Sequence, residues 1–240
     1  MATLLGRRFG QQIAGWLIAF PWTSAPVSFF LALDHGPEFA ATAAKGSVAI
    51  AVGEVAFAVG YSRVKRGWLL SLLAGSVGYV LAGVAFGFVD LPVLPLALVV
   101  GVLVILGGRL LPPPAPTTRV AHVVPRWDLP ARVLLTTALV LGITLVAPRL
   151  GAYGSAIVAS FPLYGCVLAV FAERHGRHAD AVDVMRGMVS GLFGYMSFFI
   201  VIALALVPLG TVLAFALAVL TVLVVQGITL AALHGRAPWQ

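Results

Sequence analysis

Blocks of apolar residues, about eight of them and each about twenty residues long, follow one another along this chain. A hydrocarbon core about 30 Å thick is crossed by about twenty residues of α-helix. Because lipid offers no hydrogen-bond partners, the backbone polar groups of each block must bond within the block, which favours helices over the strands of a barrel. The sequence therefore predicts an all-α, polytopic integral membrane protein with about eight transmembrane helices.

The predicted spans are joined by short turns, with one exception. They cover residues 12–33, 39–61, 67–89, 91–110, 131–147, 154–172, 185–206 and 209–233. The exception is the segment 112–130, which begins PPPAP after Leu111 and ends at Pro130. Proline at this density cannot continue a helix. We therefore expect a cytoplasmic linker between a first transmembrane repeat, 1–111, and a second, 131–240.

Composition and charge exclude several classes of function. The chain is 61% hydrophobic and only 10% charged, whereas about a quarter of the residues in a soluble domain are charged. The net charge of +7 comes from basic residues in short loops, as the positive-inside rule expects, so we predict a lipid bilayer and no nucleic acid as the partner. A single cysteine, Cys166, rules out a disulfide within the chain. We expect no metal and no cofactor.

The basic residues also predict the orientation. If both termini are cytoplasmic, the inner side of the membrane holds 13 basic residues and the outer side holds 2. Basic residues collect in cytoplasmic loops. We therefore predict that the N-terminus and the C-terminus are both cytoplasmic.

The two halves of the chain resemble each other at a shift of 141 positions. At this shift Phe20-Pro21 matches Phe161-Pro162, and Lys45 matches Arg186. The first span and its counterpart, the sixth, cross the membrane in opposite directions, so the repeat is inverted. Inverted repeats are a common construction of secondary transporters. A duplication that kept a stable bundle without transport is the alternative.

One stretch also resembles a known family. The segment GWLIAFPWTSAPVSFF, followed by LDHGPEFAATAAKGSVAIAVGEVAFAVGY, is similar to the small GlpM-like inner-membrane proteins. The matching positions are Gly15, Phe20, Pro21, Lys45 and Gly46, and the second half keeps Phe161, Pro162, Arg186 and Gly187. The resemblance covers residues 13–61 and 152–203. It implies a bacterial inner-membrane location, and it transfers no reaction or substrate.

Two prolines fall within apolar spans. Pro21 and Pro162 each remove a helix hydrogen bond, and breaks at matching places in two repeats indicate a binding site. Thr23, Ser24 and Tyr164 could add hydroxyl groups there. The alternative is an ordinary kink that neighbouring helices tolerate.

Glu54 lies inside the second span, between AVG and VAFAVG. An ionisable group in lipid is expensive and usually faces a cavity or a partner, so Glu54 is our candidate proton carrier. Its counterpart in the second repeat is Tyr195, which is not an acid. A hydrogen-bonded structural glutamate is the alternative.

Lys45 and Arg186 lie about two turns inside their spans, near opposite faces of the membrane. Long basic side chains can extend to the interface. Alternatively the pair could attract an anionic substrate from each side. Nine helical steps separate Lys45 from Glu54, which puts them on opposite sides of one helix.

Two further patterns have structural interpretations. Gly46, Gly53 and Gly60 recur every seven residues, and Gly187 and Gly191 form a small-xxx-small pair, as in closely packed membrane helices. The segment 173–183, ERHGRHADAVD, could bind a metal through its histidines and carboxylates. We expect it to be a solvated turn instead.

These patterns together predict a small secondary transporter or permease, and not an enzyme. It would work by alternating access around the two Phe-Pro pairs, with Glu54 as a proton-linked group and Lys45 and Arg186 attracting a small anionic solute. The alternative is a non-transporting membrane partner or assembly protein that uses its glycine-rich faces for docking or for homo-oligomerisation. A membrane-embedded enzyme ranks third.

Overall fold

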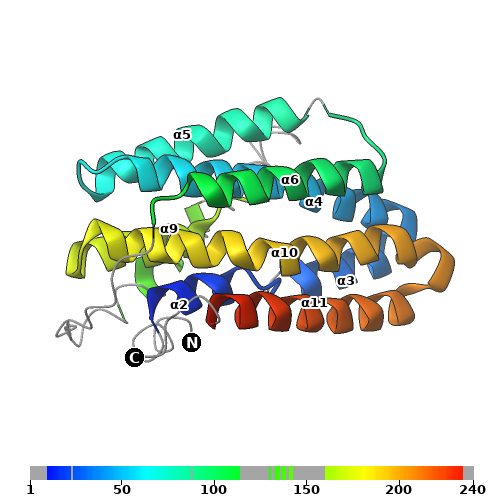
Figure 1. The fold of residues 1–240 in the computed structure, drawn as a ribbon. Helices are drawn as coiled ribbons and strands as arrows, with labels where there is room; N and C mark the ends of the chain where they lie inside the picture. The colour runs from blue at the N-terminus through cyan, green and yellow to red at the C-terminus, as the bar shows by residue number, and fades with distance from the viewer. Residues whose placement is uncertain are drawn as a thin grey trace.

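A computed structural model describes residues 10–22, 24–87, 89–113 and 160–234, with residues 130, 133–135, 137–138 and 141–142 between them. Every regular element in these residues is an α-helix (Figure 1). In chain order the helices are α2 (Gln11–Ile18), α3 (Ser24–His35), α4 (Pro37–Arg63), α5 (Trp68–Gly87), α6 (Val93–Leu110), α9 (Leu163–His175), α10 (His178–Leu209) and α11 (Thr211–His234). For the described residues, the prediction of an all-α protein is confirmed.

Five of these helices, α4, α5, α6, α10 and α11, are long and apolar enough to cross a membrane. They match the predicted spans 39–61, 67–89, 91–110, 185–206 and 209–233. The outer helices present large apolar side chains to the surroundings, as at Leu81, Leu98 and Val212, which are 65%, 73% and 80% exposed. Water would penalise so large an apolar surface, whereas lipid does not. The helices are those of a multi-pass membrane protein.

The remaining predicted spans differ from the structure. The span 12–33 is two helices, α2 and α3, because the chain leaves the helical conformation between Ala19 and Trp22. The span 154–172 appears as α9, which begins only after Pro162. Most of the span 131–147, residues 114–129 of the linker and residues 148–159 lie outside the described residues.

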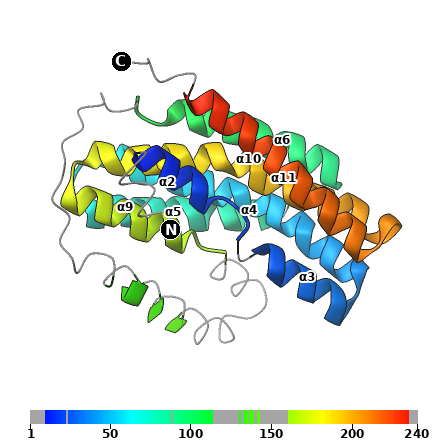
Figure 2. The same cartoon turned by 90° about the horizontal axis from the view of Figure 1, so that it is seen from below.

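The helices lie side by side with α4 and α10 at the centre. α4 packs against α5, α6 and α10, while α10 also packs against α2, α9 and α11. Figure 1 shows α5 along one edge of the bundle and α11 along the opposite edge, with α10 between α6 and α11, and Figure 2 shows the same bundle from below. The α4–α5 and α9–α10 turns lie at one end, called here the α4–α5 end. The α3–α4, α5–α6 and α10–α11 connections lie at the other, the α3–α4 end (Figure 1).

Glycine allows the closest helix contacts. A Cβ atom on Gly187 of α10 would lie 2.7 Å from the backbone nitrogen of Trp16 in α2, and one on Gly15 would lie 3.0 Å from the backbone nitrogen of Met188. Gly191 faces the carbonyl oxygen of Trp16 in the same way. The prediction that Gly187 and Gly191 serve close helix packing is confirmed.

Glycines of α4 behave less uniformly. Gly53 and Gly60 contact α5 closely, against Tyr79 and the backbone of Ala74. Gly46, the first of the seven-residue series, has no atom within 4 Å of its Cβ position among the described residues. The packing prediction therefore holds for two of these three glycines.

The segment 173–183 is not the solvated turn that the sequence predicts. α9 continues to His175 and α10 begins at His178, so only Gly176 and Arg177 separate them. The Asp180 side chain accepts a hydrogen bond from the backbone N–H of Arg177 at 2.6 Å. This carboxylate caps the start of α10, which explains why a charged stretch belongs to a helix.

The glycine contacts generate a prediction of stability. We expect Gly187→Ala to destabilise the folded protein by about 1–3 kcal/mol, because the new methyl group meets the α2 backbone, which cannot rotate away. Gly46→Ala is the matched control and should change the stability little, because the space beside it is open. Thermal unfolding of both variants in detergent measures the difference. Equal melting temperatures would show that α2 and α10 are not in close contact.

Candidate functional site

The first Phe-Pro pair interrupts the path of the chain between α2 and α3. The N–H of Trp22 donates to the carbonyl oxygen of Phe20 at 2.7 Å, which makes Pro21 the middle residue of a three-residue turn. The carbonyl oxygen of Pro21 then accepts the N–H of Ala25 at 3.0 Å and so starts α3. The prolines' predicted effect on helix continuity is confirmed here. Thr23 lies outside the described residues.

The second Phe-Pro pair has the same backbone hydrogen bonds. The N–H of Leu163 donates to the carbonyl oxygen of Phe161 at 2.7 Å, and the N–H of Cys166 donates to that of Pro162 at 2.9 Å. Pro162 has φ −74° and ψ 60°, the conformation of an inverse γ-turn. Each bond falls 141 positions after its counterpart in the first half. The two breaks are alike in geometry as well as in sequence.

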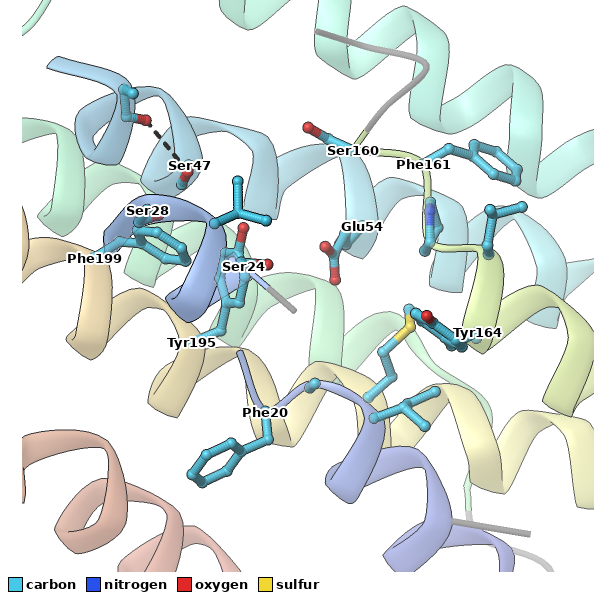
Figure 3. Close-up of a pocket in the computed structure, with 18 of the residues that line it drawn as sticks. Phe20, Ser24, Ser28, Ser47, Glu54, Ser160, Phe161, Tyr164, Tyr195 and Phe199 are labelled. Carbon is cyan, nitrogen blue, oxygen red and sulfur yellow. Dashed lines mark hydrogen bonds between the residues drawn. The ribbon is translucent and has the colours of Figure 1, made fainter. Parts of the chain in front are cut away.

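A cavity of about 490 Å³ lies between the two breaks (Figure 3). Of the residues that the sequence singles out, the cavity is lined by Phe20, Ser24, Glu54, Phe161, Pro162, Tyr164 and Tyr195. Pro21 is buried and shapes the first break without lining the cavity. The structure therefore brings together the two Phe-Pro pairs and the intramembrane glutamate, which lie on α3, α4, α9 and α10 and their connections.

Glu54 occupies the middle of this cavity. Figure 3 shows its carboxyl group between Ser24 and Tyr195 on one side and Phe161 and Tyr164 on the other. The side chain is half-buried, because water-sized space reaches it although α4 is a central helix. Within the described residues, no side chain donates a hydrogen bond to this carboxyl group and no cation pairs with it. The carboxyl group is therefore available to a proton or a ligand.

Hydroxyl groups supply most of the other polar atoms in the cavity. Ser24 and Ser28 come from α3, Ser47 comes from α4, and Ser160 precedes the second break. The hydroxyl of Tyr195 on α10 lies close to those of Ser24 and Ser47. Hydroxyls can both donate and accept hydrogen bonds, so they can orient a polar ligand of either kind.

Sequence reasoning missed Ser28, Ser47 and Ser160. One signal was present for two of them. Ser28 follows Ser24 by four positions and Ser47 precedes Glu54 by seven, and residues at these spacings share a helix face. Ser160 had no such signal, because it lies outside a regular helix.

Lys45 lies away from the cavity. Its Nζ atom pairs with Oδ1 of Asp90, at 2.6 Å, in the connection between α5 and α6. This hydrogen bond, together with the charge of Lys45, lowers the pKa of the Asp90 carboxyl group. The prediction that Lys45 and Glu54 do not pair is confirmed, while the hypothesis that Lys45 belongs to a substrate pathway has no support from its position.

Arg186 does not reach the cavity either. Its Nε atom donates to the carbonyl oxygen of Pro112 at 2.7 Å, just after α6 ends. Lys45 and Arg186 therefore hold opposite ends of the bundle, as the sequence predicts for their relative positions. Each side chain binds to a connection of α6.

The lining of the cavity limits what it can bind. Among the described lining residues there is one carboxyl group, several hydroxyls and no lysine, arginine or histidine. In the same part of the chain, no group of three or more metal-ligating side chains is present. The arrangement can exchange a proton at Glu54, and it can hold a small polar molecule or a cation beside the carboxylate.

No protein-family model, curated protein or solved structure matches this chain. The resemblance to the GlpM-like proteins therefore stays a prediction.

The Lys45–Asp90 pair generates a pH prediction. Because the pKa of Asp90 is lower in the folded protein than in the unfolded chain, the pair's stabilisation is complete above the ordinary aspartate pKa. It is lost as the pH falls through the lowered folded value. We expect the melting temperature of Asp90→Asn to be slightly lower than that of wild type at neutral pH. In strong acid the two melting temperatures should be equal.

The control for this measurement is Asp34→Asn. Asp34 is exposed near the same end of the bundle and makes no hydrogen bond or ion pair with the described residues. Its substitution should leave the melting temperature unchanged at either pH. Equal melting of wild type and Asp90→Asn at neutral pH would mean that the ion pair contributes nothing.

Proposed function

We propose that this protein is a small proton-linked membrane transporter that works by alternating access. The observation that carries the proposal is the Glu54 carboxyl group, which none of the described residues pairs with, in a cavity between two matching helix breaks. A buried ionisable group without a partner is costly in a membrane and is kept where it has a function. A sealed core that capped Glu54 would have favoured a structural role instead.

The order of elements supports two inverted repeats. Each half has a Phe-Pro break followed by a short helix, a long central helix and an apolar outer helix. These helices are α3, α4 and α5 in the first half and α9, α10 and α11 in the second. α10 begins 141 positions after α4, the same offset that relates the two breaks. α4 and α10 run in opposite directions and pack together. A site between inverted repeats is the arrangement that alternating access requires.

The breaks give the two repeats a way to move. A helix interrupted by proline has unmatched backbone groups, and the short segments on either side can change their angle at low cost. Rocking of α3 against α2, and of the corresponding pair around Phe161-Pro162, would open the cavity first to one side and then to the other. With both termini cytoplasmic, the α4–α5 end is the inner end of the bundle.

The cavity supports a small neutral or cationic polar substrate in place of an anion. Its volume falls in the range of small-molecule sites. A carboxylate repels an anion, and neither Lys45 nor Arg186 is near enough to offset that repulsion. Protonation of Glu54 would remove the charge before the empty carrier returns, which links the proton to the substrate.

The non-transporting partner is less well supported. That hypothesis needs free glycine-rich faces for docking to another membrane protein. Gly53, Gly60, Gly187 and Gly191 instead face neighbouring helices of this same chain. Gly46 has open space beside it, as do Gly101 of α6 and Gly227 of α11, and these helical positions are left for such docking.

Alternating access predicts two-sided labelling of the cavity. Cys166 is the single cysteine, so a Cys166→Ser background allows a reporter cysteine at Ser28, which lines the cavity. We expect a membrane-impermeant maleimide to label Ser28→Cys from either face of sealed vesicles. Ser71→Cys is the control and should stay unlabelled, because Ser71 is fully buried between α5 and its neighbours. Labelling from one face only would overturn alternating access.

The proton-linked role predicts the chemistry of Glu54. A hydrophobic carbodiimide reacts with protonated carboxyl groups inside membranes, so mass spectrometry should find its adduct on Glu54. Once the carboxyl group ionises, labelling should fall about tenfold for each further pH unit. Glu54→Gln should remove the adduct, whereas Glu38→Gln should retain it, because Glu38 is an exposed residue in the first turn of the same helix. If labelling of Glu54 did not change with pH, a role for Glu54 as a proton carrier would be excluded.

A further inference from the structure

A second cluster of ionisable side chains lies at the α4–α5 end, outside the cavity. Tyr61 of α4 donates its hydroxyl hydrogen to Oε2 of Glu173 in α9 at 2.9 Å. Nδ1 of His178 in α10 lies 3.3 Å from the same oxygen. The rings of Tyr61 and His178 are stacked, with centroids 6.3 Å apart and planes 2° from parallel. Two helices, α4 and α10, therefore each bring one side chain to a carboxyl group on a third helix, α9.

The hydrogen bonds around His178 define where its protons lie. Nε2 is 3.2 Å from the backbone carbonyl oxygen of Ser62. A carbonyl oxygen only accepts, so Nε2 must carry the hydrogen. A neutral imidazole then has no hydrogen on Nδ1, and that nitrogen would face Oε2 of Glu173 as acceptor against acceptor. The pair is therefore stable when one further proton sits on either the imidazole or the carboxyl group.

The cluster is mostly buried and lies beside a turn at the end of the bundle. The side chains of Glu173 and His178 are 9% and 19% exposed, next to the Gly176-Arg177 turn. Tyr61 is fully buried beneath them. This gradation runs from partly exposed His178 to buried Tyr61, which is the order that a proton entering from water would meet.

Tyr61 connects the cluster to α4, the helix that carries Glu54. It follows Glu54 by seven positions on α4, so the two side chains share a helix face about 10 Å apart along the axis. Cys166 of α9 interacts electrostatically with both Glu54 and Tyr61, so it lies near both of them.

The other charged groups nearby are occupied elsewhere. Arg63 of α4 donates to the carbonyl oxygen of Leu110, and Arg174 of α9 lies over the ring of Trp68. Asp180 of α10 caps its own helix. Asp183, five positions after His178 on α10, has its own contacts.

We propose that Tyr61, Glu173 and His178 form a proton-exchange site that supplies Glu54 from the α4–α5 end of the bundle. The inference rests on the proposed function and extends it, because it names the route of the coupling proton. A proton arriving from water binds the His178–Glu173 pair. The protonated Glu173 carboxyl group then gives its proton to the hydroxyl oxygen of Tyr61, whose own hydrogen leaves toward the cavity, and the pair takes up another proton from water.

The test follows protonation of Glu54 in time. Time-resolved infrared spectroscopy after a drop in external pH records the carboxyl band of Glu54, which is assigned by its loss in Glu54→Gln. Vesicles with the α4–α5 end outward are identified by labelling of Arg177→Cys in the Cys166→Ser background, because Arg177 is exposed in the turn. We expect Glu173→Gln and Tyr61→Phe each to lower the rate at which the band appears by about a hundredfold. This is the lower end of what a positioned acid–base group contributes to a rate.

Controls separate this inference from folding and from the proposed function. Tyr61→Phe keeps the ring stack and removes one hydroxyl group, so the final amplitude of the Glu54 band should equal that of wild type. Glu38→Gln should leave the rate unchanged. If wild type has no Glu54 band, the proposed function fails. If the band appears at the wild-type rate in both Glu173→Gln and Tyr61→Phe, only the proton-exchange site is overturned.

Discussion

A proline inside a membrane helix has no N–H to donate, and its ring displaces the carbonyl group four residues earlier. Water could satisfy the freed backbone groups in a soluble protein, but lipid cannot. In this protein the same tight turn forms at Pro21 and at Pro162. In each case the carbonyl oxygen of the proline then accepts the first hydrogen bond of the next helix. The cavity, its serines and the access to Glu54 all depend on these turns.

Close helix packing keeps the cavity from collapsing or spreading. Gly15 and Gly187 bring α2 against α10, while Gly53 and Gly60 bring α5 against α4. Buried Gln226 of α11 adds a polar link, because its amide donates to the carbonyl oxygen of Gly191 at 3.1 Å. The two central helices are thereby held by neighbours on their outer sides, and the space that remains lies between the breaks.

Local patterns in the sequence predicted the parts of the site that depend on one segment. Proline chemistry identified Pro21 and Pro162, and the cost of charge in lipid identified Glu54. Partners from distant segments could not be found in this way. Nothing in the sequence joins Lys45 to Asp90 or Tyr61 to Glu173, because these contacts exist only once helices from different parts of the chain pack together. The start of α10 was also missed, since its capping acid resembles loop composition.

α6 is bound differently at its two ends. At one end the carbonyl oxygens of Leu110 and Pro112 receive Arg63 of α4 and Arg186 of α10, so three helices meet through neutral acceptors that neither salt nor acid removes. At the other end the attachment is the exposed pair of Lys45 and Asp90, which ions in the water can screen. The attachment of α6 at the α4–α5 end is therefore insensitive to salt, whereas its attachment at the α3–α4 end is sensitive to salt. High ionic strength would then loosen α6 at the α3–α4 end and leave it attached at the α4–α5 end.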